Sequence, residues 1–279
     1  MVAIINCGKL ATGLKNNIVI NLIRTTGCLV VSLLVCLIVG FSKLDGIGLF
    51  LVILSGVAMG LMMVVWLLST QYAQVILVEV FAMIGGVIVP LFLAPYLING
   101  DNVSLLQWIG AFILIVALFL FSKGGDGKKL TFKGILLLLS YLVITAVSMI
   151  TQTCYSYYST GSSEDFQLYT FLFATITLII MFIFISAFHK KSDKTVENPK
   201  FNLKVIIYIS IAIVFLYIGN LLSKLSTTYL PQTVFYPFSY VISMPLIFIT
   251  EAIVYKQKVT FNNILALILV VASGILVNL

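Results

Sequence analysis

Glu79 is the residue of this sequence whose type and position are best suited to chemistry. It lies within Val75–Met83, where every other side chain is apolar. A carboxylate in lipid is costly unless it is paired, protonated or turned toward a water-filled cavity. Glu79 could therefore bind a proton or a cationic substrate, or it could be the structural partner of Arg24. Arg24 could itself contact a carboxylate of a substrate or reach the cytoplasmic headgroups.

Polar side chains recur at helical spacing in two other apolar segments. Within 132–157 the spacing places a polar stripe on one face of a helix, and 17–40 carries a second stripe. In lipid such stripes must face protein or water, so they predict either a cavity lining or hydrogen bonds between helices. The first stripe consists of Tyr141, Thr145, Ser148, Gln152 and Tyr155, and the second of Asn21, Thr25, Cys28 and Ser32.

The segment 47–69 carries a stripe of methionine, tryptophan and serine side chains. Such a stripe is typical of packing between helices, but it could also form the wall of a permissive cavity. Gly56 and Gly60 form a GxxxG pattern on the neighbouring face, which predicts a close helix–helix contact. The stripe consists of Ser55, Met59, Met62, Trp66 and Ser69.

Two segments at matching places in the halves of the chain are interrupted by glycine or proline. The segment 72–97 contains Gly85-Gly86, Pro90 and Pro95, and 229–255 contains three prolines. Interrupted helices at corresponding positions indicate the binding site of a transporter.

Each interrupted segment also offers candidate binding residues. Met83 shares a helical face with Glu79, and Tyr236, Tyr240 and Ser243 share a face of 229–255. The tyrosines could hold an organic cation together with Trp66 by cation–π contact, or they could be packed and hydrogen-bonded.

The composition defines the class of protein to which these residues belong. The chain has 279 residues, of which 61% are hydrophobic and only 9% charged, with a net charge of +7. A soluble domain carries about 25% charged residues. A soluble enzyme, a nucleic-acid binder and a disordered chain are therefore excluded, and a polytopic all-α membrane protein is predicted. Intramembrane catalytic motifs such as HExxH and GxSxG are missing, so we expect no enzyme, no cofactor and no metal site.

A helix needs roughly 20 apolar residues to cross the hydrocarbon core. The sequence contains nine such runs, at 17–40, 47–69, 72–97, 104–122, 132–157, 165–188, 203–223, 229–255 and 261–278.

The loops between these runs predict the orientation of the chain in the cell membrane. All of the 16 basic residues except Lys43 and Lys224 fall at or near loops on one side. Basic loops face the cytoplasm, so the loop at 190–200 is expected inside and the C-terminus outside.

The two halves of the chain resemble each other. Leu68–Tyr72 and Leu225–Tyr229 share a Leu-Ser-Thr-x-Tyr pattern, and each precedes an interrupted segment. The halves 1–124 and 125–279 are therefore expected to be repeats of five helices each, inverted in the membrane because five is odd. In the first repeat only about residues 1–11 correspond to the first helix, which is expected to be a stub.

These features resemble the ten-helix, EamA-type members of the drug/metabolite transporter superfamily. The similarity covers nearly the whole chain. It is carried by Asn21–Gly27, Trp108–Ala111, Leu230–Pro237 and Tyr255–Thr260.

The resemblance implies a secondary active transporter that moves an amine, an amino acid or a related solute by alternating access around a midplane cavity. The partners would be a small-molecule substrate, the lipid bilayer and protons as the candidate coupling ion, with no nucleic acid, in a monomer or weak homodimer. Two alternatives stay open: a lipid-linked-sugar flippase of the same superfamily, and a non-transporting membrane remnant or partner.

The orientation can be tested by chemical labelling of intact cells. Cysteines introduced into the 190–200 loop are expected to be shielded from membrane-impermeant thiol reagents, whereas a C-terminal tag is reachable from outside. Labelling of the 190–200 loop from outside would contradict the orientation.

Overall fold

The computed structural model describes residues 14–73, 75–97, 104–123, 131–188, 203–229, 245–246, 248–249 and 260–277. These residues are 93% helical and include no strand, which makes the described chain an all-α protein as predicted. Five helices are long and apolar enough to cross a membrane: Asn17–Val39, Gly46–Tyr72, Phe132–Tyr158, Ser163–Ala187 and Ile206–Ser226. Nine membrane spans and the inverted repeat stay predictions.

The helices follow the predicted apolar runs closely. Run 203–223 extends further than expected, because the helix continues to Tyr229. Run 229–255 lies almost wholly outside the described residues, and so do residues 1–11. The bounds are α2 Leu14–Val39, α3 Gly46–Tyr72, α4 Val75–Met83, η1 Ile84–Ile88, α5 Val89–Leu97, α6 Leu105–Lys123, α7 Phe132–Tyr158, α8 Ser163–Phe188, α9 Leu203–Tyr229 and α11 Phe261–Val277.

The predicted interruption of 72–97 is confirmed at the glycine pair. The helix passes from α4 through the π-helical turn η1 into α5, and Gly85 and Gly86 both lie in η1. A Cβ atom at Gly85 would collide with the carbonyl oxygen of Leu142 in α7. The glycine therefore lets the backbones of η1 and α7 approach closely, and π-helical turns of this kind are frequent at functional sites.

The chain divides into two compact units. Unit 1 consists of Met1–Leu67 and Cys154–Thr228, and unit 2 of Leu68–Thr153 and Tyr229–Leu279. Each unit thus takes segments from both halves of the sequence. This division follows contacts in space, so it does not test the predicted repeats 1–124 and 125–279.

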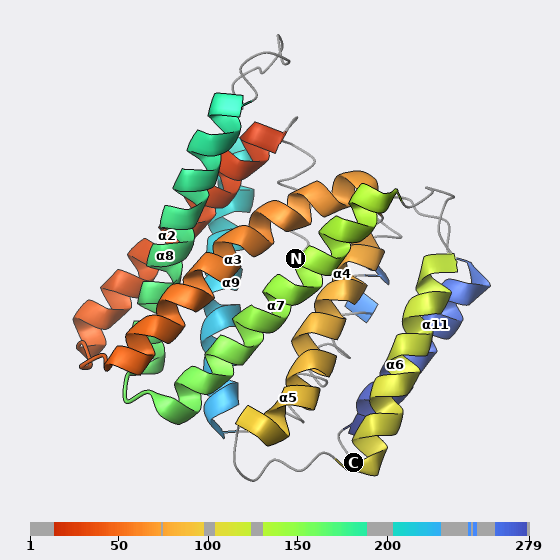
Figure 1. The fold of residues 1–279 in the computed structure, drawn as a ribbon. Coiled ribbons are helices and arrows are strands. Elements are labelled where there is room, and N and C mark those ends of the chain that lie inside the picture. The colour runs from red at the N-terminus through yellow and green to blue at the C-terminus, as the bar shows by residue number, and fades with distance from the viewer. Residues whose placement is uncertain are drawn as a thin grey trace. The chain divides into compact units, whose positions relative to one another are not determined.

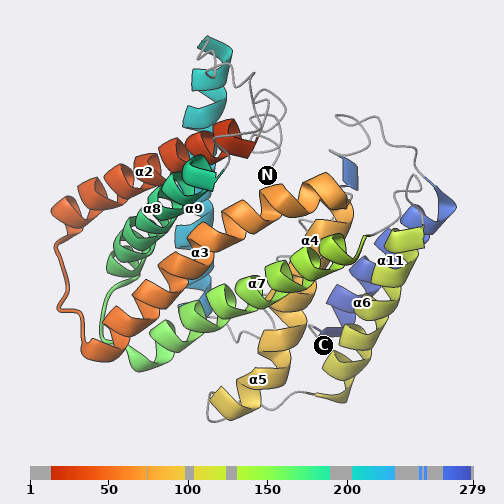
Figure 2. The ribbon, with the colours of Figure 1, turned by 45° about the horizontal axis from the view of Figure 1, so that its top comes forward.

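In unit 1, α2 packs along α8, and Figures 1 and 2 show the two helices side by side. Helix α3 meets α8 through the predicted GxxxG contact. A Cβ atom at Gly56 would lie 2.7 Å from the carbonyl oxygen of Thr170, and one at Gly60 would lie 2.7 Å from the Cβ of Thr177. Only glycine allows this approach, so the predicted helix–helix contact is confirmed.

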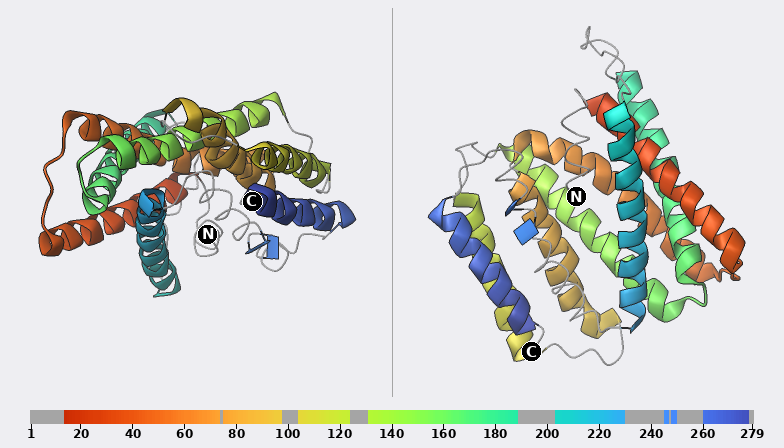
Figure 3. Two further views of the ribbon diagram at one scale, coloured as in Figure 1. Left: turned by 90° about the horizontal axis from the view of Figure 1, so that it is seen from below. Right: turned by 180° about the vertical axis from the view of Figure 1, so that it is seen from behind.

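In unit 2, α6 packs along α11, as Figure 3 also shows from behind. The Ser273 hydroxyl in α11 donates a hydrogen bond of 2.7 Å to the carbonyl oxygen of Gly110 in α6. The rings of Phe92 and Trp108 meet edge to face with centroids 4.2 Å apart and join α5 to α6. A hydrogen bond thus joins α6 to α11, and an aromatic contact joins α5 to α6.

Gly56→Ala is expected to destabilise the protein by about 1–3 kcal/mol, because the added methyl group overpacks the contact of α3 with α8. The matched control is Gly219→Ala in α9, where a Cβ atom meets nothing within 4 Å. Thermal unfolding of the purified protein in detergent measures both variants. Equal melting temperatures for the two variants would contradict the close contact.

Candidate functional site

The candidate residues predicted from the sequence fall into both units. Unit 1 contains Arg24, Met59, Met62 and Trp66, and unit 2 contains Glu79, Met83, Tyr141, Thr145, Ser148 and Gln152. The remaining candidates, Tyr236, Tyr240 and Ser243, lie outside the described residues.

Glu79 is buried inside unit 2. Its side chain is 4% exposed, and it lies in the apolar helical stretch Leu77–Ile88. Met83, one turn further along α4, and Gly86 in η1 are buried on the same face. The ionisable residue of this stretch therefore lies directly before the π-helical interruption.

The polar stripe of α7 faces the protein interior. Tyr141, Thr145 and Gln152 are buried, and Ser148 is half-buried. The Thr145 hydroxyl donates a hydrogen bond of 2.8 Å to the carbonyl oxygen of Tyr141 in its own helix. Because its own helix satisfies this hydroxyl, Thr145 needs no partner from another helix and is compatible with a cavity wall.

The second stripe, on α2, is also buried, and Arg24 lies beside it. Arg24 is 2% exposed, and its Nη1 donates a hydrogen bond of 2.8 Å to Oδ1 of Asn21. The hydroxyl of Ser32 donates to the carbonyl oxygen of Cys28 at 2.8 Å. The guanidinium is thus held inside unit 1 by a neighbouring amide one turn away.

Lys224 is a candidate that the sequence analysis missed. It was assigned to a loop beyond the end of run 203–223, but it lies inside α9 and is 2% exposed. Its Nζ donates a hydrogen bond to the hydroxyl of Ser156. The same atom lies 4.7 Å from the ring centroid of Tyr155 and 5.2 Å from that of Phe166. Lys224 could have been found from the sequence, because a lysine within an apolar span such as Ile206–Ser226 is unusual and indicates a buried charge.

Asp165 joins the start of α8 to the loop between α2 and α3. Asp165 is 0% exposed. Its Oδ2 accepts hydrogen bonds from the backbone N–H of Ser42 at 2.9 Å, from the Ser42 hydroxyl, and from the Ser162 hydroxyl at 2.7 Å. Ser162 also caps α8, since its hydroxyl accepts the Asp165 N–H at 3.1 Å. One carboxylate therefore fixes two loops and a helix end.

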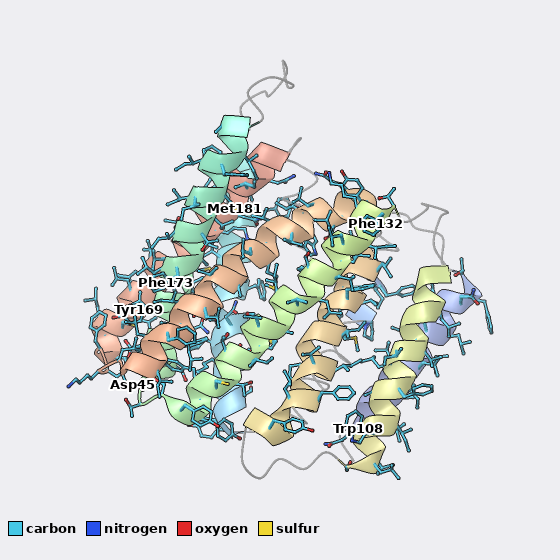
Figure 4. The ribbon with its side chains drawn as sticks, viewed as in Figure 1. Asp45, Trp108, Phe132, Tyr169, Phe173 and Met181 are labelled. Atoms are coloured by element: carbon cyan, nitrogen blue, oxygen red, sulfur yellow. The ribbon has the colours of Figure 1, made fainter. Side chains whose placement is uncertain are left out.

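Asp45 makes a second link between the loop that joins α2 to α3 and the loop that joins α7 to α8. Its Oδ1 accepts a hydrogen bond of 2.7 Å from the Ser159 hydroxyl and one of 3.2 Å from the backbone N–H of Gly48. The hydrogen bond from Ser159 is the main cause that lowers the pKa of Asp45 below its ordinary value of 3.8. Figure 4 shows Asp45 at the start of α3, and Tyr169 and Phe173 on the neighbouring α8. We call Ser42, Asp45, Ser159, Ser162 and Asp165 the loop clamp.

The chain matches no protein-family model, and a comparison with curated proteins finds no match.

Asp165→Ala is expected to destabilise the protein by roughly 1–3 kcal/mol, because it leaves donors of Ser42 and Ser162 without their acceptor. Asp45→Ala is the matched control and should cost less, because Asp45 is more exposed and water can replace its contacts. Thermal unfolding at neutral pH measures the difference. A larger loss for Asp45→Ala would contradict the assigned role of Asp165.

Proposed function

We propose that this chain is a secondary active transporter that moves a small organic solute, such as an amine or an amino acid, across the cell membrane by alternating access. The observation that carries the proposal is the burial of Arg24, Glu79 and Lys224, which are 2%, 4% and 2% exposed in apolar helices. Ionisable residues in such positions are rare, and they mark the pathways of substrates and ions.

The packing within each unit supports the proposed repeat architecture. Helices α2 and α8, which pack together, would be the second helices of the two repeats. Helices α6 and α11, which also pack together, would be the fifth helices. In inverted-repeat transporters a pseudo-twofold axis relates equivalent helices, so such pairs are expected to meet near the axis. The π-helical turn η1 falls in the fourth helix, where the interruption of a transporter helix is expected.

The proposed mechanism assigns the coupling role to Glu79. A buried carboxylate can be neutralised by a proton or by a cationic group of the substrate, but not by both at once. Competition between the two would exchange protons for substrate across the membrane. The inward-facing hydroxyl and amide groups of α7, including Thr145, Ser148 and Gln152, would give the solute polar contacts on its way.

The function is tested with purified protein in vesicles that carry a pH gradient. A panel of radiolabelled amines, amino acids and sugars should contain at least one solute whose uptake depends on the gradient. If no solute accumulates, the proposed transport function is wrong. Movement of a labelled sugar-lipid across the membrane would instead identify a flippase.

Glu79→Gln is expected to abolish gradient-driven uptake and leave the melting temperature nearly unchanged, since the amide has almost the same shape. If Glu79 only neutralises a buried cation, the same change should destabilise the protein by about 3–5 kcal/mol. Glu164→Gln in the first turn of α8 is the matched control and should transport normally. Full uptake by Glu79→Gln with an unchanged pH dependence would remove Glu79 from the mechanism.

A further inference from the structure

The helical segment of α4, η1 and α5 is packed differently on the two sides of its π-helical turn. Beyond η1, the side chains of Phe92, Leu93 and Tyr96 in α5 are 47%, 37% and 87% exposed. Before and within η1, by contrast, the buried side chains include Val78, Val80, Met83, Val87 and Ile88. The first part of the segment is therefore held inside unit 2, whereas these side chains of α5 lie on its surface.

The backbone of η1 is fixed against α7. A Cβ atom at Gly85 would collide with the carbonyl oxygen of Leu142 and would lie 3.2 Å from the backbone nitrogen of Ala146. Beyond η1, α5 contacts α6 through the rings of Phe92 and Trp108. A contact between two side chains can rearrange without breaking a backbone hydrogen bond, so it holds α5 less firmly than the close backbone contact holds η1.

The backbone between these two parts is built to bend. The N–H of Val89 donates to the carbonyl oxygen of Ile84, which is the hydrogen bond of a π-helical turn. Pro90 has no N–H, so it cannot form the α-helical hydrogen bond to the carbonyl oxygen of Gly86, four residues earlier. Gly85 and Gly86 are also weak helix formers. Helices bend most sharply at proline and at π-helical turns, and here the two features adjoin.

From these observations we infer that η1 and Pro90 form a hinge on which α5 swings relative to α4 and α7. Hinges are a few residues at the ends of elements that absorb a change in backbone angles, and such movements gate many sites. The predicted orientation places the loop after α5 outside the cell, so α5 would act as an outer gate. The gating role rests on the proposed transport function, whereas the hinge itself is a property of unit 2 alone.

The hinge is tested by measuring distances between spin labels on the purified full chain, in a cysteine-free background. One label is placed at position 96 in α5 and the other at position 143 in α7, because Tyr96 and Val143 are both exposed. The hinge predicts two populated distances for this pair. A single distance would overturn the inference.

The control pair joins position 71 at the end of α3 to the same position 143. Gln71 is exposed, and the neighbouring ring of Tyr72 lies 5.1 Å from Nζ of Lys133 in α7. This pair does not cross η1 and should give one distance. Two distances for both pairs would mean that α7 itself moves, which would also overturn the inference.

Pro90→Ala supplies the missing N–H, which can then donate to the carbonyl oxygen of Gly86, and the variant should lose the second distance of the 96–143 pair. The matched control is Pro95→Ala, which removes a proline from the same helix beyond the hinge and should keep both distances. If Pro90→Ala does not fold, the decisive measurement is a thiol cross-link between cysteines at positions 92 and 108, which should leave one distance. Both distances surviving in Pro90→Ala, or in the cross-linked protein, would overturn the hinge.

Uptake into vesicles separates the gate from the proposed function. The cross-link between positions 92 and 108 should stop uptake, and its reduction should restore uptake. The control cross-link joins positions 110 and 273, where α6 and α11 are already held together by a hydrogen bond, and should leave uptake intact. If no solute is transported but the two distances depend on Pro90, the proposed function is wrong and the hinge stands. If uptake continues with positions 92 and 108 cross-linked, the gate is wrong and the function stands.

Discussion

A charged group inside a bilayer has no water to solvate it, and this constraint governs the structure of the described chain. Protein groups must interact with each buried charge in place of water, because burying a charge without partners costs several kcal/mol. The chain meets the constraint with short-range contacts. Arg24 donates a hydrogen bond to an amide one turn away. Lys224 donates one to a serine and makes cation–π contacts with two rings. Serine and threonine hydroxyls such as those of Ser32 and Thr145 donate to carbonyl oxygens of their own helices.

The same constraint explains the loop clamp at the end of unit 1. The start of α8 has free N–H groups, and the loops beside it expose serine hydroxyls that need acceptors. Asp165 supplies a carboxylate at 0% exposure, and Asp45 supplies a second one nearer the solvent. The loop between α2 and α3 is thereby fixed to the loop between α7 and α8 and to the start of α8.

The sequence predicts much of this fold because hydropathy and glycine spacing are local signals. The helical runs, the contact at Gly56 and Gly60, and the interruption at Gly85-Gly86 all follow from such signals. Buried faces on α2 and α7 could be predicted for the same reason, since a helix repeats its faces every three to four residues.

The loop clamp and the surroundings of Lys224 could not be predicted in this way. Ser42 and Asp165 are 123 residues apart, and Ser156 and Lys224 are 68 apart, so these pairs form only when helices pack. Lys224 was placed outside its helix because a single lysine lowers the hydropathy at the end of a run. The aromatic rings that stabilise the ammonium come from α7 and α8, and nothing in the sequence around Lys224 indicates them.

The central claim is that the inward-facing polar residues line a solute pathway that opens to either side of the membrane. Ser148 is half-buried on the polar face of α7, near the middle of that helix. The most direct measurement places a single cysteine at position 148 in a cysteine-free background and applies a membrane-impermeant thiol reagent from each side in turn. Ile180, exposed on the surface of α8, is the control position. Alternating access predicts that position 148 reacts from both sides, at rates that solute changes in opposite directions, while position 180 does not react. A position 148 that reacts from neither side, or from one side at a rate independent of solute, would contradict the account.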